Sequence, residues 1–180
     1  MNFVQPIRDL VKLQEMKVYL KSKSQRNYML FILGISTGLR ISDILKLKKE
    51  DLLSTHVVLR ETKTRKQKRI RIPPPIRKEV LEYAKELTDG DYVIQSRQGT
   101  NRAIDCSTAY RILREAAAHV HLNEIGTHTL RKTFGYHFYQ QTKDVAMLQE
   151  MFNHSSPQIT LTYIGINQDS MDKAMMKFKI

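Results

Sequence analysis

Residues 25–36 hold the feature that most constrains the fold, a segment that is apolar on all sides around the run from Tyr28 to Ile35. A helix with such a sequence has no polar face to present to water, so other elements must enclose it. The run is shorter than the ~18 apolar residues that a membrane span needs. We therefore expect a buried helix, stopped by Gly38, at the centre of a soluble protein.

The chain has 180 residues, which is long enough to enclose such a helix. This length predicts one domain, spanning 1–180, that can bury its core without disulfides. Cys106 is the only cysteine, so a disulfide framework is excluded and any zinc site would depend almost wholly on histidines. We expect a cytoplasmic protein.

The charge is concentrated in one segment. The chain carries 30 Lys+Arg against 18 Asp+Glu, a net charge of +12. The segment 60–78 holds nine basic residues and one acid, Glu61, so +8 of that charge lies there. A local excess of this size indicates a polyanion partner, most often nucleic acid. The alternative is a solvated basic loop without a partner.

The same segment has the alternation of a β-hairpin. We predict strands at His56–Arg60 and Arg69–Pro73 around a polar turn at Lys63–Lys68. The prolines that follow cannot continue a ladder. Asp91–Gln95 reads as a third strand, so the predicted fold is mainly α with a small three-stranded antiparallel sheet, an α+β arrangement.

The rest of the chain shows helical periodicity and helix-start signals. Asp105 or Ser107 is expected to cap one helix, and Ser156-Pro157 starts another that ends before Gly165. The expected helices are 7–21, a short one from Ile41, 76–87, 109–120, one carrying Leu130, Phe134 and Phe138, 145–152, 157–164 and 170–179.

Three clusters of residues could carry chemistry. In the first, Arg40 and Asp43 share a face of a helical turn, and the arginine could offer a fork of donors to a phosphate or carboxylate. An ordinary helix-start ion pair is the alternative. In the second, His128 and Arg131 lie one helical turn apart, a proton-transfer group beside a fixed cation. Such pairs also arise by chance.

The third cluster is Asn153–Pro157 followed by Tyr163. A phenol with a pKa of ~10 is a poor nucleophile unless nearby positive charge favours its anion. The alternative is a core tyrosine with a satisfied hydroxyl.

The order and spacing of these clusters resemble the tyrosine recombinase (phage integrase) family, from about residue 25 to the end. The family's Thr-Gly-Leu-Arg motif matches residues 37–40 and carries its first catalytic arginine, Arg40. Its His-x-Leu-Arg motif matches His128 and Arg131.

The family's Leu-Gly-His-Ser-Ser segment resembles residues 152–156 and carries His154, which hydrogen-bonds the phosphate in the family. The family's nucleophile falls on Tyr163. A catalytic lysine in a Lys-Thr setting on the hairpin matches Lys63, with Lys66 as the alternative.

Two residues depart from the family pattern, and one domain is missing. Asn153 replaces the usual glycine, and Asp43 stands where many members have glutamate. Only a helical extension of about residues 1–24 precedes the match, where most members have a separate core-binding domain. The chain thus resembles the small catalytic-domain-only members, such as fimbrial-switch invertases, or a fragment of a larger integrase.

The resemblance implies a site-specific recombinase that needs no metal or other cofactor. Tyr163 would attack a DNA phosphodiester, giving a 3′-phosphotyrosyl intermediate and a free 5′-hydroxyl. Arg40 and Arg131 would bind the non-bridging oxygens, with Asp43 in support. Lys63 would protonate the leaving oxygen, and proton transfer at the tyrosine would fall to His128.

The resemblance also implies partners. Basic hairpin residues would grip DNA backbone phosphates, giving affinity without sequence information: Arg65, Lys66, Lys68 and Arg69. The final segment, about 168–180, would be an exchange helix that docks on a neighbouring protomer of a tetramer, although packing on its own domain is the alternative. Accessory DNA-bending proteins and association with a bacterial or phage-derived nucleoid are further expectations.

Two other functions remain open. A non-catalytic DNA-binding regulator would keep the basic hairpin without using the arginine, histidine and tyrosine set. A type IB topoisomerase-like enzyme would share the chemistry and rejoin the original strand.

Overall fold

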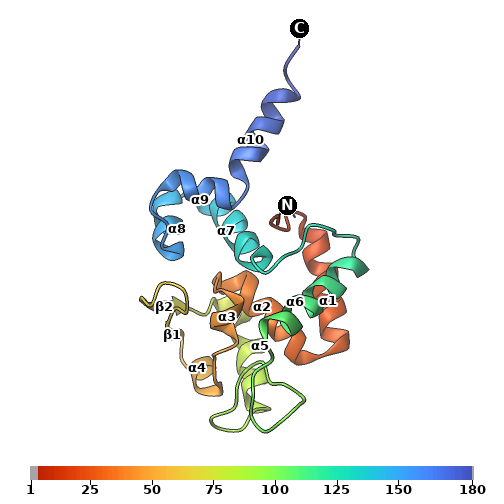
Figure 1. Cartoon of the computed structure of the whole chain (residues 1–180), viewed down its shortest axis with the longest axis vertical. Coiled ribbons are helices and arrows are strands. Elements are labelled where there is room, and N and C mark those ends of the chain that lie inside the picture. The colour runs from red at the N-terminus through yellow and green to blue at the C-terminus, as the bar shows by residue number, and fades with distance from the viewer. Residues whose placement is uncertain (1–3, 180) are drawn as a thin grey trace.

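A computed structural model describes residues 4–179, and within this range the chain forms ten helices and one two-stranded sheet (Figure 1). The elements are α1 (Leu10–Lys23), α2 (Gln25–Thr37), α3 (Ile41–Ile44), α4 (Lys49–Leu53), β1 (His56–Arg60), β2 (Gln67–Arg71), α5 (Pro74–Lys85), α6 (Cys106–His119), α7 (Thr129–Thr142), α8 (Val145–Phe152), α9 (Pro157–Tyr163) and α10 (Ile166–Met175). The ends of the predicted extension (1–3) and of the predicted exchange helix (180) lie outside the described residues.

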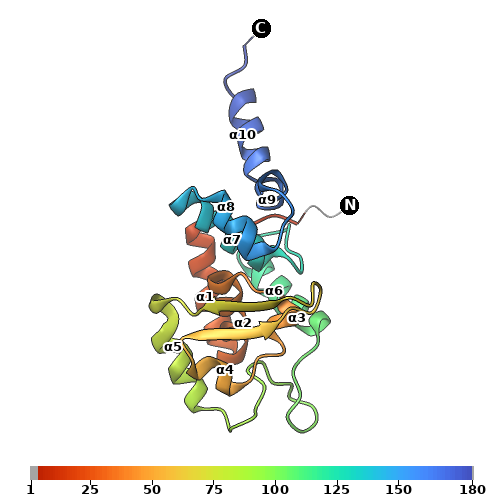
Figure 2. The same ribbon diagram turned by 90° about the vertical axis from the view of Figure 1, so that its left-hand side faces the viewer.

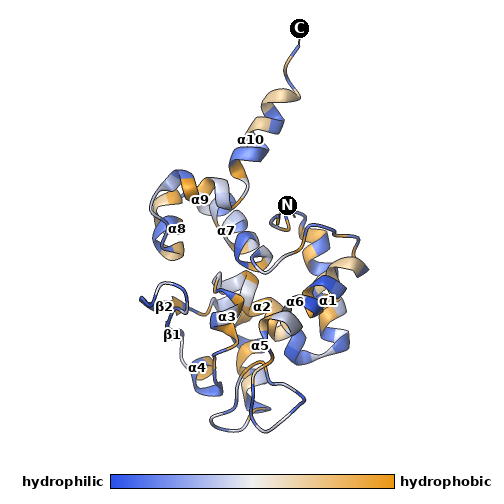
Figure 3. Ribbon diagram, viewed as in Figure 1, coloured by the Kyte–Doolittle hydropathy of each residue, from blue (hydrophilic) through white to orange (hydrophobic). Residues whose placement is uncertain are grey.

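The central helix is confirmed as α2. Its residues Leu30, Phe31 and Leu33 have no exposed surface, and α1 and α7 pack against it. A Cβ atom on Gly34 would lie 2.4 Å from a Leu130 side-chain carbon, so glycine permits the close approach of α7. Hydrophobic residues accordingly gather where α2, α3 and α5 meet (Figure 3).

The hairpin is also confirmed, although the bounds of its second strand differ from the prediction. β1 and β2 pair antiparallel from His56 opposite Arg71 to Arg60 opposite Gln67. The backbone N–H of Glu61 donates to the Lys66 carbonyl oxygen at 3.0 Å, which closes the turn early. The second strand therefore begins at Gln67, two residues before the predicted start.

The prediction of a third strand at Asp91–Gln95 is wrong, and within residues 4–179 the sheet has two strands. Tyr92 forms a single bridge with Lys48, and Gln95 forms another with Ala103. The segment is buried at Val93, as an inner strand would be, but its hydrogen bonds are divided between two neighbours. Neither pairing is long enough to make a ladder.

Several helix ends differ from the sequence-based expectation. Asp105 is the cap of α6 and accepts the Thr108 N–H at 2.6 Å. α4 was not predicted, and α5 begins at Pro74, before the expected Ile76. The last helix is α10, Ile166–Met175, because Gly165 adopts the left-handed conformation (φ 84°) and the new helix starts immediately after it.

The helices α7–α9 lie on one side of the predicted catalytic residues, and the hairpin and α3 lie on the other. α7, α8 and α9 enclose a small apolar cluster of Leu148, Phe152 and Ile164. The hairpin and α3 lie below α8, and the helix α10 extends away from the body (Figures 1 and 2). Among residues 4–179 we find no helix with the length and apolarity to cross a membrane.

Candidate active site

Arg131 connects two turns at the centre of the site. It lies in α7, is 3% exposed, and donates from Nη1 to the Gly38 carbonyl oxygen at 2.6 Å. Its Nη2 donates to the Phe152 carbonyl oxygen at 3.1 Å. Burial, together with the charge of Arg40, lowers the pKa of Arg131 to about 10, so the side chain remains cationic at neutral pH.

Arg40 lies two residues after Gly38, whose left-handed conformation (φ 65°) ends α2 and turns the chain into α3. Arg40 Nη1 lies 2.8 Å from Glu61 Oε1 and 4.0 Å from Asp43 Oδ2. Asp43 is fully buried, and its Oδ1 accepts the backbone N–H of Thr62 at 2.8 Å and the Thr62 hydroxyl at 2.7 Å. Asp43 thus holds the start of the hairpin turn more closely than it holds Arg40.

Tyr163 is the last residue of α9, and its hydroxyl lies 3.3 Å from His128 Nδ1. Burial raises the pKa of Tyr163, while the charges of Arg131 and Arg40 act in the opposite direction. Partial desolvation and the charges of Arg131, Arg40 and Lys63 lower the pKa of His128. A neutral His128 can therefore accept a hydrogen bond, and then a proton, from Tyr163.

His154 follows Asn153, which ends α8 in the left-handed conformation (φ 54°). Its Nδ1 lies 3.0 Å from the Thr160 hydroxyl oxygen, and its ring centroid lies 5.1 Å from that of Tyr163. Burial and the charges of Arg131, Arg40 and Lys68 lower the pKa of His154 to about 4. The ring is neutral at pH 7 and lies beside the tyrosine.

The hairpin lysines occupy two environments. Lys63, Arg65 and Lys66 are exposed on the turn, and Arg69 is exposed on β2. The charge of Lys63 reaches His128. Lys68 was predicted to contact DNA, yet it is 9% exposed. Its ammonium group lies 3.1 Å from Glu61 Oε1 and also contacts the Met151 carbonyl oxygen. Lys68 is therefore turned into the site, away from the outer surface of the hairpin.

Sequence reasoning missed Glu61 as a site residue. Glu61 is fully buried and lies between Arg40 and Lys68. Burial alone would raise the pKa of its carboxyl, but the Thr64 hydroxyl and the charges of Lys68 and Arg40 outweigh burial and lower the pKa to about 2. Its position as the one acid among nine basic residues was the available signal.

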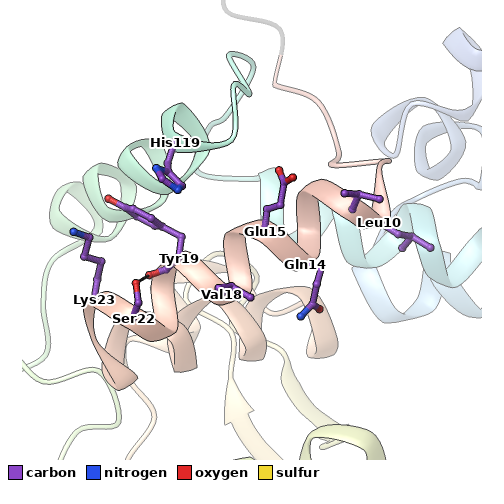
Figure 4. Close-up of a pocket in the computed structure, with 9 residues that line it drawn as sticks. Leu10, Gln14, Glu15, Val18, Tyr19, Ser22, Lys23 and His119 are labelled. Atoms are coloured by element: carbon purple, nitrogen blue, oxygen red, sulfur yellow. Dashed lines mark hydrogen bonds between the residues drawn. The ribbon is translucent and has the colours of Figure 1, made fainter.

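A groove of about 740 Å³ lies elsewhere, along the outer face of α1. Its lining includes Leu10, Val18 and Tyr19 of α1 and His119 of α6 (Figure 4). None of the candidate catalytic residues lines this groove: Arg40, Lys63, His128, Arg131, His154 and Tyr163. Within the described part of the chain, no three His, Cys, Asp or Glu residues are grouped to hold a metal ion.

Comparison with known proteins identifies the family. The model of the phage integrase family matches residues 7–169, most of the chain. The chain belongs to the phage integrase family. The probable integrase/recombinase YoeC of Bacillus subtilis is 52% identical to it over 179 residues, covering 99% of the chain and 98% of YoeC. The tyrosine recombinase XerA of Pyrococcus furiosus is 27% identical over 154 residues, 83% of the chain and 54% of XerA.

Solved structures share the fold of this phage integrase family member. The XerA recombinase crystal structure matches with a TM-score of 0.77 at 20% identity, over 98% of this chain and 67% of that chain. A lambda integrase tetramer bound to a Holliday junction matches with a TM-score of 0.70 at 18% identity, over 89% of this chain and 48% of that chain. The predicted family and the predicted enzyme class, a tyrosine-type site-specific recombinase, are thus confirmed.

Proposed function

We propose that this chain cuts and rejoins DNA strands through a 3′-phosphotyrosyl intermediate on Tyr163. The observation that carries the proposal is the 3.3 Å contact between the Tyr163 hydroxyl and His128 Nδ1, with two arginine charges acting on the same phenol. A tyrosine is a useful nucleophile only where a base takes its proton and cations stabilise its anion. Tyr163 has both.

The proposed step exchanges one phosphate ester for another. The Tyr163 oxygen bonds to phosphorus as its proton passes to His128, and the bond from phosphorus to the 5′ oxygen breaks. Lys63, on the exposed turn, gives a proton to that leaving oxygen. Attack by a 5′-hydroxyl of a partner strand then reverses these transfers and rejoins the DNA. The bond energy is kept in the phosphotyrosine, so the step uses no other cofactor.

Arg131, Arg40 and His154 would surround the non-bridging oxygens. Arg131 is held by two carbonyl oxygens and buried, so it needs little rearrangement when charge develops on the phosphate. His154 is neutral in the free protein, and a bound phosphate would favour the tautomer with a proton on Nε2. The Thr160 hydroxyl would then donate to Nδ1.

The exposed side of the hairpin would bind the DNA backbone through Arg65, Lys66 and Arg69. All three are exposed, and the turn is strongly hydrophilic (Figure 3). Phosphate contacts of this kind supply affinity and depend on salt. Lys68 is left out of this surface because its ammonium is engaged inside the site.

Helix α10 would serve as the exchange element of a tetramer on DNA. It extends away from the body, and its Met171 and Met175 are 54% and 68% exposed, as is Phe178 at 65% beyond its end (Figure 2). Apolar side chains presented in this way gain from burial against a second protomer. The tetrameric lambda integrase complex supports this assembly. Action on DNA would place the enzyme at the nucleoid, where accessory DNA-bending proteins would act with it.

Covalent trapping tests the proposal. The protein is mixed with nicked duplexes made from DNA flanking its own gene and with a pool of nicked duplexes carrying randomised arms. Denaturing gels then report DNA bound covalently to protein. We expect an adduct with the wild type and none with Tyr163→Phe. Salt-sensitive binding without any adduct would refute strand cleavage and favour a non-catalytic DNA-binding regulator.

A further inference from the structure

The Glu61 carboxylate contacts four segments of the site at once. Oε1 lies 2.8 Å from Arg40 Nη1 and 3.1 Å from Lys68 Nζ. Oε2 accepts the Thr64 hydroxyl at 2.5 Å and the Asn153 side-chain amide at 2.9 Å. These partners come from the start of α3, from β2, from the hairpin turn and from the turn before His154. One carboxylate therefore fixes the relative positions of all four.

Glu61 approaches Arg40 from the inside. Arg40 Nη1 has less than 1 Å² of accessible surface, and its 2.8 Å contact with Glu61 is an ion pair without an aligned hydrogen bond. A DNA phosphate cannot reach a nitrogen that is enclosed in this way. Glu61 and the phosphate would thus bind different edges of the same guanidinium, and Glu61 supports the phosphate contact without competing for it.

Asn153 gives a second reason to connect Glu61 with the reaction. Its left-handed backbone (φ 54°) is a conformation that glycine adopts without steric cost. Asparagine at this position adds one contact that glycine lacks, the hydrogen bond from Nδ2 to Glu61. Because Asn153 directly precedes His154, this bond ties the position of His154 to the hairpin.

We propose that Glu61 is a positioning residue for strand cleavage, which orients Arg40 toward the scissile phosphate and, through Asn153, couples the hairpin turn to His154. This inference rests on the proposed function, because it concerns how the same site reaches its reactive geometry. Glu61 acts through Arg40 and Asn153 and does not touch the DNA.

The test compares Glu61→Gln with a matched control, Glu82→Gln on α5, whose side chain is 60% exposed and pairs only with Lys85 among the described residues. The assay measures the single-turnover rate of adduct formation at saturating protein on a duplex that the wild type cleaves. DNA affinity is measured separately. We expect Glu61→Gln to slow adduct formation about tenfold with a Kd within about twofold of wild type, because small misplacements at a reacting centre are costly. Glu82→Gln should match the wild type.

A double-mutant comparison separates positioning from a general structural role. In an Arg40→Ala background, Glu61→Gln should slow cleavage only by the roughly threefold that the Asn153 contact accounts for, because the other residue through which Glu61 acts is absent. A loss of about tenfold from Glu61→Gln in that background would overturn the proposal, as would a Glu61→Gln rate equal to wild type. If the wild type itself gave no adduct, the proposal of strand cleavage would be refuted, and the proposed role of Glu61 with it.

Asn153→Gly provides a variant that keeps the backbone conformation and removes only the amide contact. It should fold as the wild type does by circular dichroism and slow adduct formation about threefold. Combined with Glu61→Gln it should add no further loss. A wild-type rate for Asn153→Gly would refute the coupling to His154, and this holds even if Glu61→Gln does not fold.

Discussion

Replacement of Gly38 by alanine should destabilise the protein by steric conflict with one aromatic ring. Gly38 has a φ of 65°, and a Cβ atom there would lie 2.4 Å from Phe134 Cδ1. The ring has little room to move, because its centroid lies 5.6 Å from that of Phe138 and 6.1 Å from that of Phe152. A left-handed alanine costs ~1–2 kcal/mol, and overpacking a filled core costs ~1–3 kcal/mol. We expect a total loss of about 2–5 kcal/mol.

Gly90→Ala is the matched control. Gly90 has a φ of 81°, and a Cβ atom there would meet no atom within 4 Å. The control therefore carries the same backbone strain without the clash, and should lose only ~1–2 kcal/mol. Urea unfolding of both variants at equal m-values gives the comparison. Equal losses for Gly38→Ala and Gly90→Ala would refute the reasoning. Because the Gly38 carbonyl oxygen accepts Arg131 Nη1 at 2.6 Å, the first variant should also slow adduct formation.

Three further predictions concern charge. His154 has a folded-state pKa of about 4, below its ordinary 6.5, so the unfolded chain takes up a proton first as the pH falls. Protonation at position 154 in the unfolded chain should lower stability by about 1–2 kcal/mol between pH 7 and pH 5. His154→Gln, measured by urea unfolding, should lose this part of the pH dependence and keep the part that the lowered pKa of His128 contributes. A pH dependence equal to that of the wild type would contradict this prediction. Arg131→Ala should slow adduct formation about 10²- to 10³-fold, and a near-normal rate would exclude it from the phosphate site. Replacing Arg65, Lys66 or Arg69 by alanine should in each case reduce the slope of the logarithm of the DNA-binding constant against the logarithm of salt concentration by about one. An unchanged slope would mean that the hairpin does not contact DNA.

Much of the fold follows from local patterns in the sequence. The apolar segment predicts α2 because only an enclosed helix satisfies it, and the alternation around the basic turn predicts the hairpin. The prediction of a third strand was wrong although Asp91–Gln95 has the burial of a strand. Its bridges are single ones, from Tyr92 to Lys48 and from Gln95 to Ala103, and do not form a ladder. Periodicity within a segment does not report how many residues of a neighbouring segment pair with it.

The sequence predicted which residues form the candidate site better than it predicted which of them contact one another. Motif order placed Arg40, His128, Arg131, His154 and Tyr163 on the chain, and the structure brings them together. Lys68 was assigned to the DNA surface on the positive charge of the hairpin alone, although strand alternation puts it on the same buried side as Ile70. The burial of Glu61 depends on contacts with Arg40 and Asn153, which are 21 and 92 residues away along the chain. Composition indicates that Glu61 is unusual without showing what it binds.

The most direct test of the account is to find which residue carries the DNA. The covalent adduct is digested with trypsin and nuclease, and the peptide that retains a nucleotide is identified by mass spectrometry. Tyr163 is the only tyrosine of the tryptic peptide 144–173, whereas Tyr136 and Tyr139 fall in the peptide 133–143. We predict a nucleotide attached through its 3′-phosphate to Tyr163. A nucleotide on the peptide 133–143, or on any residue other than Tyr163, would contradict the proposed active site.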